Sequence, residues 1–106
     1  MSNGYLTLAR IEGDPGALLD GYLRTAETMD SVGRDHGLVM HAAARTEDGL
    51  LIVNLWPSAD GSESAARDPR RLGTLAEHEP AITGMRREHR ELERFVTFER
   101  ERADAV

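Results

Sequence analysis

Cysteine is absent from this chain of 106 residues, and so are lysine and glutamine. The lack of cysteine excludes disulfides, thiolate nucleophiles and zinc–thiolate sites. All 13 basic residues are therefore arginine, a bias that we interpret as the signature of a high-GC genome, for example that of an actinobacterium. Aromatic residues make up only 5% of the chain, and Trp56 is the single tryptophan.

Basic residues are also fewer than acidic ones, 13 against 19. The formal net charge is −6 and the isoelectric point is about 5.1, which argues against nucleic acid and anionic membranes as partners. No apolar run approaches the roughly 18 residues of a spanning helix, and the first residues lack the pattern of a signal peptide. We therefore expect a cytoplasmic protein, and its length and 40% apolar content predict one globular domain over residues 1–106.

The first half of the chain carries clear local signals. Residues 5–11 are β-prone and predict a strand. Asp14 and Pro15 then form a typical helix start, since aspartate caps the free amides and proline suits the first turn. Apolar residues recur at spacings of three and four, which predicts an amphipathic helix of about twenty residues with a stripe of Leu18, Tyr22, Ala26, Met29 and Val32. Gly37 is placed to end it.

Residues 38–46 and 50–56 flank Asp48-Gly49, a strong hairpin signal. With Asp48-Gly49 as the loop, Arg45 opposes Ile52, Ala43 opposes Asn54 and His41 opposes Trp56.

These two strands divide into a mixed face and an apolar face. The mixed face carries His41, Arg45, Asn54 and Trp56, together with Val39. The apolar face consists of Leu38, Met40, Ala42, Ala44, Leu51, Val53 and Leu55. We expect the apolar face to pack against helices and the mixed face to meet a second subunit.

The second half is less regular. Ser58 is placed to cap a short helix from Ala59 to about Asp68, and residues 70–78 predict a further helical turn or two. Residues 86–93 suit a charged helix, whereas a final strand is expected near residues 92–100. The order strand, helix, strand, strand, helix, strand predicts an α+β chain with the ferredoxin-like βαββαβ fold, an antiparallel sheet with helices on one face.

The segment Leu51-Ile52-Val53-Asn54-Leu55-Trp56-Pro57-Ser58, after its Asp48-Gly49 turn, resembles the antibiotic-biosynthesis monooxygenase superfamily. The resemblance implies a homodimeric α/β barrel with a small-molecule pocket in each subunit. Some such proteins oxidise phenols or quinols with dioxygen and no cofactor, and others degrade haem.

The family's site residues transfer only in part. Trp56 matches the family's tryptophan, but the asparagine expected four residues earlier is Ile52, and Asn54 lies two residues away on the same face. For haem degradation, Asn3 is too early in the chain and Ala66 stands where a histidine is expected.

We single out His41, Asn54 and Trp56 as candidate catalytic residues: a base for a phenolic proton, an amide that orients oxygen, and a ring that stacks on an aromatic ligand. Each also suits a purely structural place at a dimer interface. Of the remaining histidines, His36 fits a helix C-terminus, and His78 and His89 fit solvated charged surfaces. No phosphate loop, metal motif or cofactor site is evident.

Two functions therefore stay open. The first is a cofactor-independent monooxygenase acting on an aromatic, polyketide-type molecule. The second is a non-catalytic barrel that binds a small molecule or serves as an accessory protein, with haem binding or degradation as a weaker third possibility.

Overall fold

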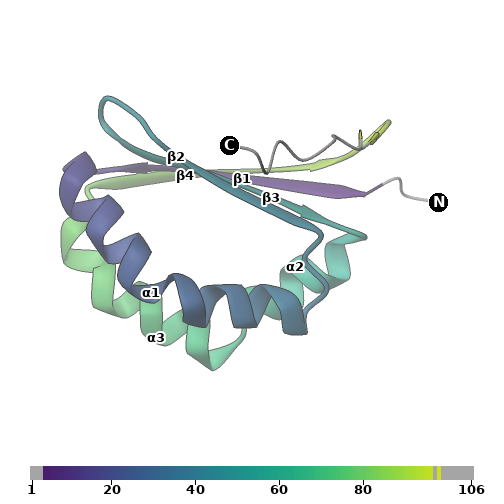
Figure 1. Cartoon of the computed structure of the whole chain (residues 1–106), viewed down its shortest axis with the longest axis horizontal. Coiled ribbons are helices and arrows are strands. Elements are labelled where there is room, and N and C mark those ends of the chain that lie inside the picture. The colour runs from purple at the N-terminus through teal and green to yellow at the C-terminus, as the bar shows by residue number, and fades with distance from the viewer. Residues whose placement is uncertain (1–3, 97, 99–106) are drawn as a thin grey trace, which may run out of the picture.

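The computed structural model describes residues 4–96 and residue 98. Its elements in chain order are β1 (Tyr5–Glu12), α1 (Pro15–Asp35), β2 (Met40–Arg45), β3 (Gly49–Trp56), α2 (Ala59–Ala66), α3 (Pro69–His78), the 3-10 turn η1 (Glu79–Ala81) and β4 (Gly84–Glu91). The four strands form one antiparallel sheet in the order β2-β3-β1-β4, and the helices lie on one side of it (Figure 1). The predicted ferredoxin-like fold is confirmed.

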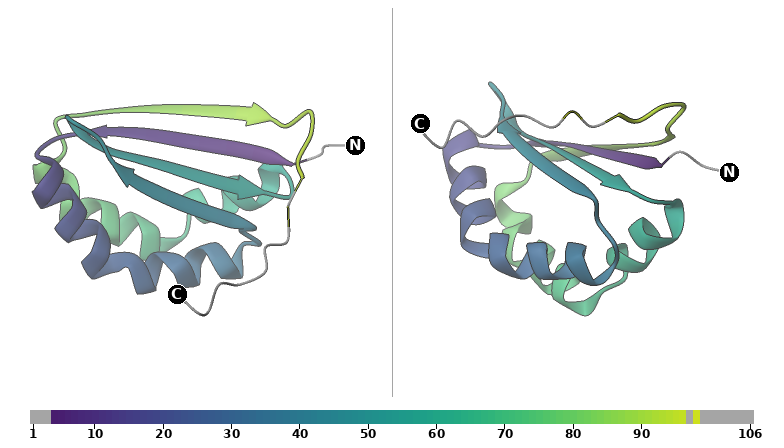
Figure 2. Two further views of the ribbon diagram at one scale, coloured as in Figure 1. Left: turned by 45° about the horizontal axis from the view of Figure 1, so that its top comes forward. Right: turned by 45° about the vertical axis from the view of Figure 1, so that its right-hand side comes forward.

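Helix α1 begins and ends as its sequence predicts. The Asp14 carboxylate accepts a hydrogen bond of 2.9 Å from the amide of Ala17, and Pro15 occupies the first turn. At the other end Gly37 adopts a φ of +85°, in the left-handed region that favours glycine. The helix crosses the sheet with α3 beside it (Figure 2).

The β2–β3 hairpin differs from its predicted register. Thr46 donates its amide to the carbonyl of Gly49 at 2.9 Å, so the two-residue loop is Glu47-Asp48 and not Asp48-Gly49. Every pair along the hairpin shifts by two residues: His41 opposes Asn54 rather than Trp56. Because side chains alternate with a period of two, this shift leaves each residue on the face to which it was assigned.

The direction of those faces was wrong. His41, Leu50, Ile52, Asn54 and Trp56, which belong to the mixed face, line a cavity against the helices. The apolar face, with Met40, Ala42, Ala44, Leu51, Val53 and Leu55, points to the opposite side of the sheet. Both faces are largely apolar: the mixed face carries Leu50, Ile52 and Trp56, and the other carries Leu51, Val53 and Leu55. Hydrophobic pattern alone does not decide between two such faces.

The last strand also lies earlier than predicted. β4 pairs with β1 from Gly84, opposite Glu12, to Glu91, opposite Tyr5. The charge-rich run 86–91 is therefore strand rather than helix; beyond it the amide of Leu92 donates a hydrogen bond of 2.9 Å to the carbonyl of Gly4, and residues 92–96 have no strand assignment. Residues 97, 99 and 100 of the predicted final strand lie outside the described residues.

The buried core is small. Val32, Trp56 and Ala65 form its centre, with Tyr5 and Leu38 packed against it. Within residues 4–96 and 98, no helix is long and apolar enough to cross a membrane.

Two glycine substitutions provide a matched test of this packing. A Cβ at Gly49 would collide with the backbone carbonyl of Ile11 on the neighbouring strand, whereas a Cβ at Gly73 in α3 would meet no heavy atom within 4 Å. We expect Gly49→Ala to lower the free energy of unfolding by about 1–3 kcal/mol, and Gly73→Ala to raise it by about 0.5–1 kcal/mol. Chemical denaturation measures both, and a Gly49→Ala variant as stable as the parent chain would contradict the described register.

Candidate functional site

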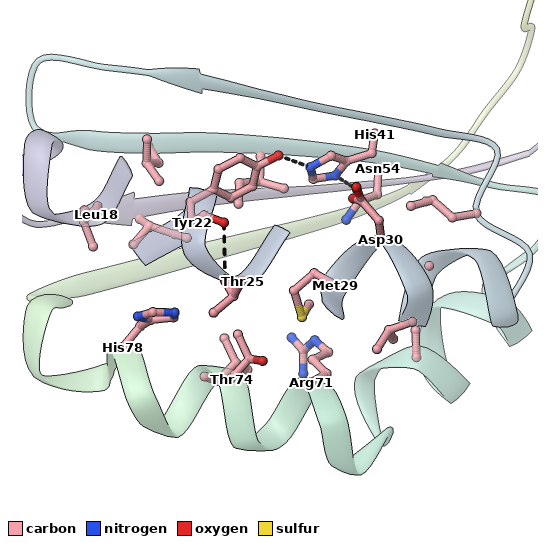
Figure 3. Close-up of a pocket in the computed structure, with 18 of the residues that line it drawn as sticks. Leu18, Tyr22, Thr25, Met29, Asp30, His41, Asn54, Arg71, Thr74 and His78 are labelled. Carbon is pink, nitrogen blue, oxygen red and sulfur yellow. Dashed lines mark hydrogen bonds between the residues drawn. The ribbon is translucent and has the colours of Figure 1, made fainter. Parts of the chain in front are cut away.

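A cavity of about 170 Å3 lies between the sheet and the helices (Figure 3). Its wall is mostly apolar, and a few polar groups interrupt it. We call it the main cavity. The sheet contributes Ile11, His41, Leu50, Ile52, Asn54 and Trp56 from its inner face, and α1 contributes Leu18, Tyr22, Thr25, Met29, Asp30, Val32 and Gly33. The opposite wall consists of Arg71, Thr74, Leu75 and His78 from α3 and of Ile82 after η1. Leu38, before β2, and Ala65 of α2 complete the lining.

A chain of hydrogen bonds joins three elements at the sheet side of the main cavity. The Oδ1 atom of Asn54 lies 2.6 Å from Nδ1 of His41, and the hydroxyl of Tyr22 lies 2.5 Å from Nε2 of the same ring. The rings of Tyr22 and His41 also stack, with centroids 5.8 Å apart. Tyr22, His41 and Asn54 thus connect α1, β2 and β3.

These contacts fix the protonation pattern of a neutral His41 ring. An amide oxygen only accepts hydrogen bonds, so Nδ1 carries the proton and donates it to Asn54. Nε2 then has the free lone pair and accepts a hydrogen bond from the Tyr22 hydroxyl. The arrangement presents a basic nitrogen to a phenolic O–H group inside a mostly apolar wall.

Electrostatics keep Tyr22 in its protonated form. Burial raises the pKa of Tyr22 above its ordinary value of 10.0, and the nearby carboxylate of Asp30 raises it further. Both effects act against the negative phenolate. At neutral pH Tyr22 is therefore a hydrogen-bond donor.

Trp56 closes the end of the cavity beside α2. The side chain is only 5% exposed and packs on Val32 and Ala65. Its indole N–H points to the hydroxyl of Thr7 at 3.4 Å. The ring is held firmly and offers an apolar surface to the main cavity.

Helix α3 contributes two nitrogen-bearing side chains, Arg71 and His78, to the wall of the main cavity. Arg71 donates a hydrogen bond to the carbonyl of Ala66, and burial lowers its pKa, with nearby Arg87 lowering it further. His78 packs against Gly21, where the missing side chain leaves room for the imidazole ring. The Nε2 atom of His78 is buried and has no hydrogen-bond partner among the described residues.

The structure brings the three predicted site residues together. His41, Asn54 and Trp56 line the same cavity, and His41 contacts Asn54 directly rather than facing Trp56. Ile52, which stands four residues before Trp56, lines the cavity too.

Sequence reasoning missed three other members. Tyr22 was assigned to the apolar stripe of its helix, although a tyrosine in such a stripe also carries a hydroxyl that needs a partner. His78 was expected on a solvated surface and is instead part of the cavity wall. Arg71 gave no local signal, because nothing in the sequence shows which arginine of a short helix turns inward. His36, by contrast, caps α1 as expected and contacts Asp68 at 3.0 Å.

The protonated state of Tyr22 can be tested directly. Because Asp30 contributes to the raised pKa, Asp30→Asn should lower the pKa of Tyr22 toward 10.0. The phenolate absorbance of each protein, minus that of its Tyr22→Phe counterpart, isolates the titration of this one tyrosine. Since the folded-state pKa is raised, the associated stability is present below pH 10 and is lost as pH rises through the folded pKa. A Tyr22 pKa unchanged by Asp30→Asn would contradict the described proximity of the two groups.

No family model matches the sequence, and no curated protein matches it. Solved structures do match. A single-residue mutant of SnoaB, a cofactor-independent oxygenase from Streptomyces nogalater, has a TM-score of 0.72 at 14% identity, covering 90% of this chain and 98% of that one. A candidate antibiotic biosynthesis monooxygenase from Caulobacter crescentus has a TM-score of 0.72 at 12% identity, covering 88% and 92%.

A dimeric ferredoxin-like protein from an uncultured marine organism has a TM-score of 0.69 at 12% identity and covers 95% of both chains. At these identities the likeness concerns the fold. The resemblance to the antibiotic-biosynthesis monooxygenase superfamily is confirmed at that level, and the chain has the ferredoxin-like, monooxygenase-like fold of these proteins.

Proposed function

We propose that the chain is a cofactor-independent, monooxygenase-like protein that binds an aromatic phenol of polyketide type in the main cavity and oxidises it with dioxygen. The observation that carries the proposal is the hydrogen-bond chain from Tyr22 through His41 to Asn54 in a mostly apolar wall. His41, Asn54 and Trp56 are the proposed catalytic residues, and Tyr22 joins them.

The proposed first step is removal of the phenolic proton. His41 Nε2 is the base, and the substrate hydroxyl reaches it through the Tyr22 hydroxyl, which passes on one proton as it receives another. Asn54 stabilises the resulting imidazolium by accepting the Nδ1 proton in a hydrogen bond. Such a bond to a charged donor is stronger than the same bond to the neutral ring.

The second step needs only dioxygen. The electron-rich phenolate adds dioxygen at the ring carbon para to its oxygen, and His41 returns the proton to give a hydroperoxide. Loss of the hydrogen on that carbon together with hydroxide forms a quinone and water. One phenol and one dioxygen thus yield one quinone and one water, with no external reductant.

The dimensions of the cavity agree with an aromatic ligand. A cavity of about 150 Å3 lined by apolar side chains encloses a benzene-sized molecule, and the main cavity measures about 170 Å3. Trp56 supplies a flat surface for stacking. One aromatic ring therefore fits inside the main cavity.

Haem fits this site less well. Both ring nitrogens of His41 are engaged in hydrogen bonds, and the main cavity is small for a porphyrin. A ligand carrier without catalysis uses the same cavity, and it differs from an oxygenase in one measurable respect: it consumes no dioxygen.

We further propose that the chain forms a homodimer through the outer face of the sheet. Leu6 and Leu8 on β1 lie opposite Leu55 and Val53 on β3, and β2 adds Met40, which is 40% exposed. An apolar face of this extent is typical of an interaction site, and the dimeric ferredoxin-like protein shares the fold.

Removal of the proposed base provides the main test of function. Phenol and quinol binding is followed by quenching of Trp56, the sole tryptophan, and turnover by dioxygen uptake. We expect His41→Gln to reduce dioxygen uptake about a hundredfold or more with a smaller change in binding.

Tyrosine variants supply the matched control. Tyr22→Phe should also slow turnover, whereas Tyr5→Phe removes the only other tyrosine hydroxyl, which does not line the main cavity, and should not. Saturable binding without dioxygen uptake by any tested phenol would support the ligand carrier instead. Saturation by hemin alone would support haem binding, and no saturation at all would refute a ligand site beside Trp56.

The proposed dimer is tested by a charge on each of two surfaces. Val53→Asp places a carboxylate on the outer face of the sheet and should yield a monomer by light scattering. Leu23→Asp places the same group on α1, at a side chain that is already 60% exposed, and should leave the dimer intact. A monomeric parent chain, or a dimer that only Leu23→Asp disrupts, would refute the outer face as the interface.

A further inference from the structure

A second cavity of about 110 Å3 lies next to the main cavity, between β4, β1 and the helices α2 and α3. The two cavities adjoin, because both are lined by Ile52, Asn54, Trp56, Ala65 and Arg71. Its basic groups are Arg71, Arg87 and His89, and we call it the basic chamber.

The strand register explains why these groups converge. Arg87 and His89 are two residues apart on β4 and so point to the same face of the sheet. They lie opposite Ala9 and Thr7 on β1, small residues that leave the space open. Arg71 enters from α3 on the other side.

Among residues 4–96 and 98, no acidic side chain balances the charges of the basic chamber. The chain has 19 acidic residues against 13 basic ones, yet no aspartate or glutamate lines this chamber. Neither Arg71 nor Arg87 makes a salt bridge within residues 4–96 and 98. After burial, the charge of Arg87 is the second cause that lowers the pKa of Arg71, so the two guanidinium groups repel each other, and an anion between them would relieve that repulsion.

We infer that the basic chamber binds the carboxylate of the same ligand whose phenolic ring occupies the main cavity, so that the substrate class is a phenol bearing a carboxylate side group. This inference rests on the proposed function for the position of the ring. A planar carboxylate suits two arginine forks, each of which offers parallel N–H donors. Arg71 borders both cavities and thereby determines which ring substituent is accepted.

The test compares two ligands that differ only in charge. Para-hydroxyphenylpropanoate and its neutral amide, para-hydroxyphenylpropanamide, are titrated into the full chain by calorimetry. We expect the carboxylate to bind about tenfold more tightly than the amide. Arg87→Gln, an exposed strand position that tolerates substitution, should reduce this preference to about threefold or less, as should Arg71→Gln.

Arg86→Gln is the matched control. It removes the same charge from the adjacent residue, whose side chain points to the other face of the sheet, and it should leave the preference intact. Equal affinities in the parent chain, or a preference that Arg87→Gln does not change, would overturn the inference.

Failure of the proposed function gives a different result. If neither phenol binds, propanoate and inorganic phosphate are titrated separately while the arginine Nε–H resonances are followed by NMR. Shifts of Arg71 and Arg87 with propanoate would support a carboxylate site even though the phenol proposal had failed. Shifts with phosphate alone, or none, would overturn the carboxylate assignment.

Discussion

Successive side chains of a strand point to opposite faces of the sheet, and in this chain both faces of β1 and β3 are apolar. The helices cover only one of them: Leu50 and Ile52 face α1 and α3, while Leu51 and Val53 face away. This constraint determines the position of the candidate site, since His41 and Asn54 can meet Tyr22 only on the covered side. It also leaves the other side with an apolar surface that the described residues cover only in part, since Leu55 is buried whereas Met40 is 40% exposed.

Signals that act over a few residues allowed much of the fold to be predicted. Asp14, Pro15 and Gly37 mark the ends of α1 because capping is local. The hairpin was predicted as well, but its register was not, because Asp48-Gly49 favours one loop whereas Gly49 in the structure pairs with Glu12 of β1 and is already part of β3. β4 was misplaced for a similar reason: its arginines and glutamates have little β-propensity, and pairing with β1 overrides that preference.

The candidate site was predicted in part for the same physical reason. Alternation along β2 and β3 sufficed to place His41, Asn54 and Trp56 on one face. No local rule indicates which helix will meet that face, so Tyr22, 19 residues before His41, was missed. The position of His78 was also missed, because its ring fits beside the cavity only where Gly21 of α1 has no side chain.

The charges around the two cavities favour one orientation of the proposed ligand. Asp30 lies beside Tyr22 at the phenol end of the main cavity and raises the pKa of that tyrosine, so a second carboxylate placed there is repelled. Arg71 projects from α3 into the wall of the same cavity and also lines the basic chamber. A phenol bearing a carboxylate is therefore favoured with its hydroxyl toward His41 and its carboxylate toward Arg71. The reversed orientation would set two carboxylates together and leave the arginines without a counter-ion. Because the phenolic oxygen then faces the Tyr22 hydroxyl that is hydrogen-bonded to Nε2 of His41, the same charges that select the ligand also align the proton with its base.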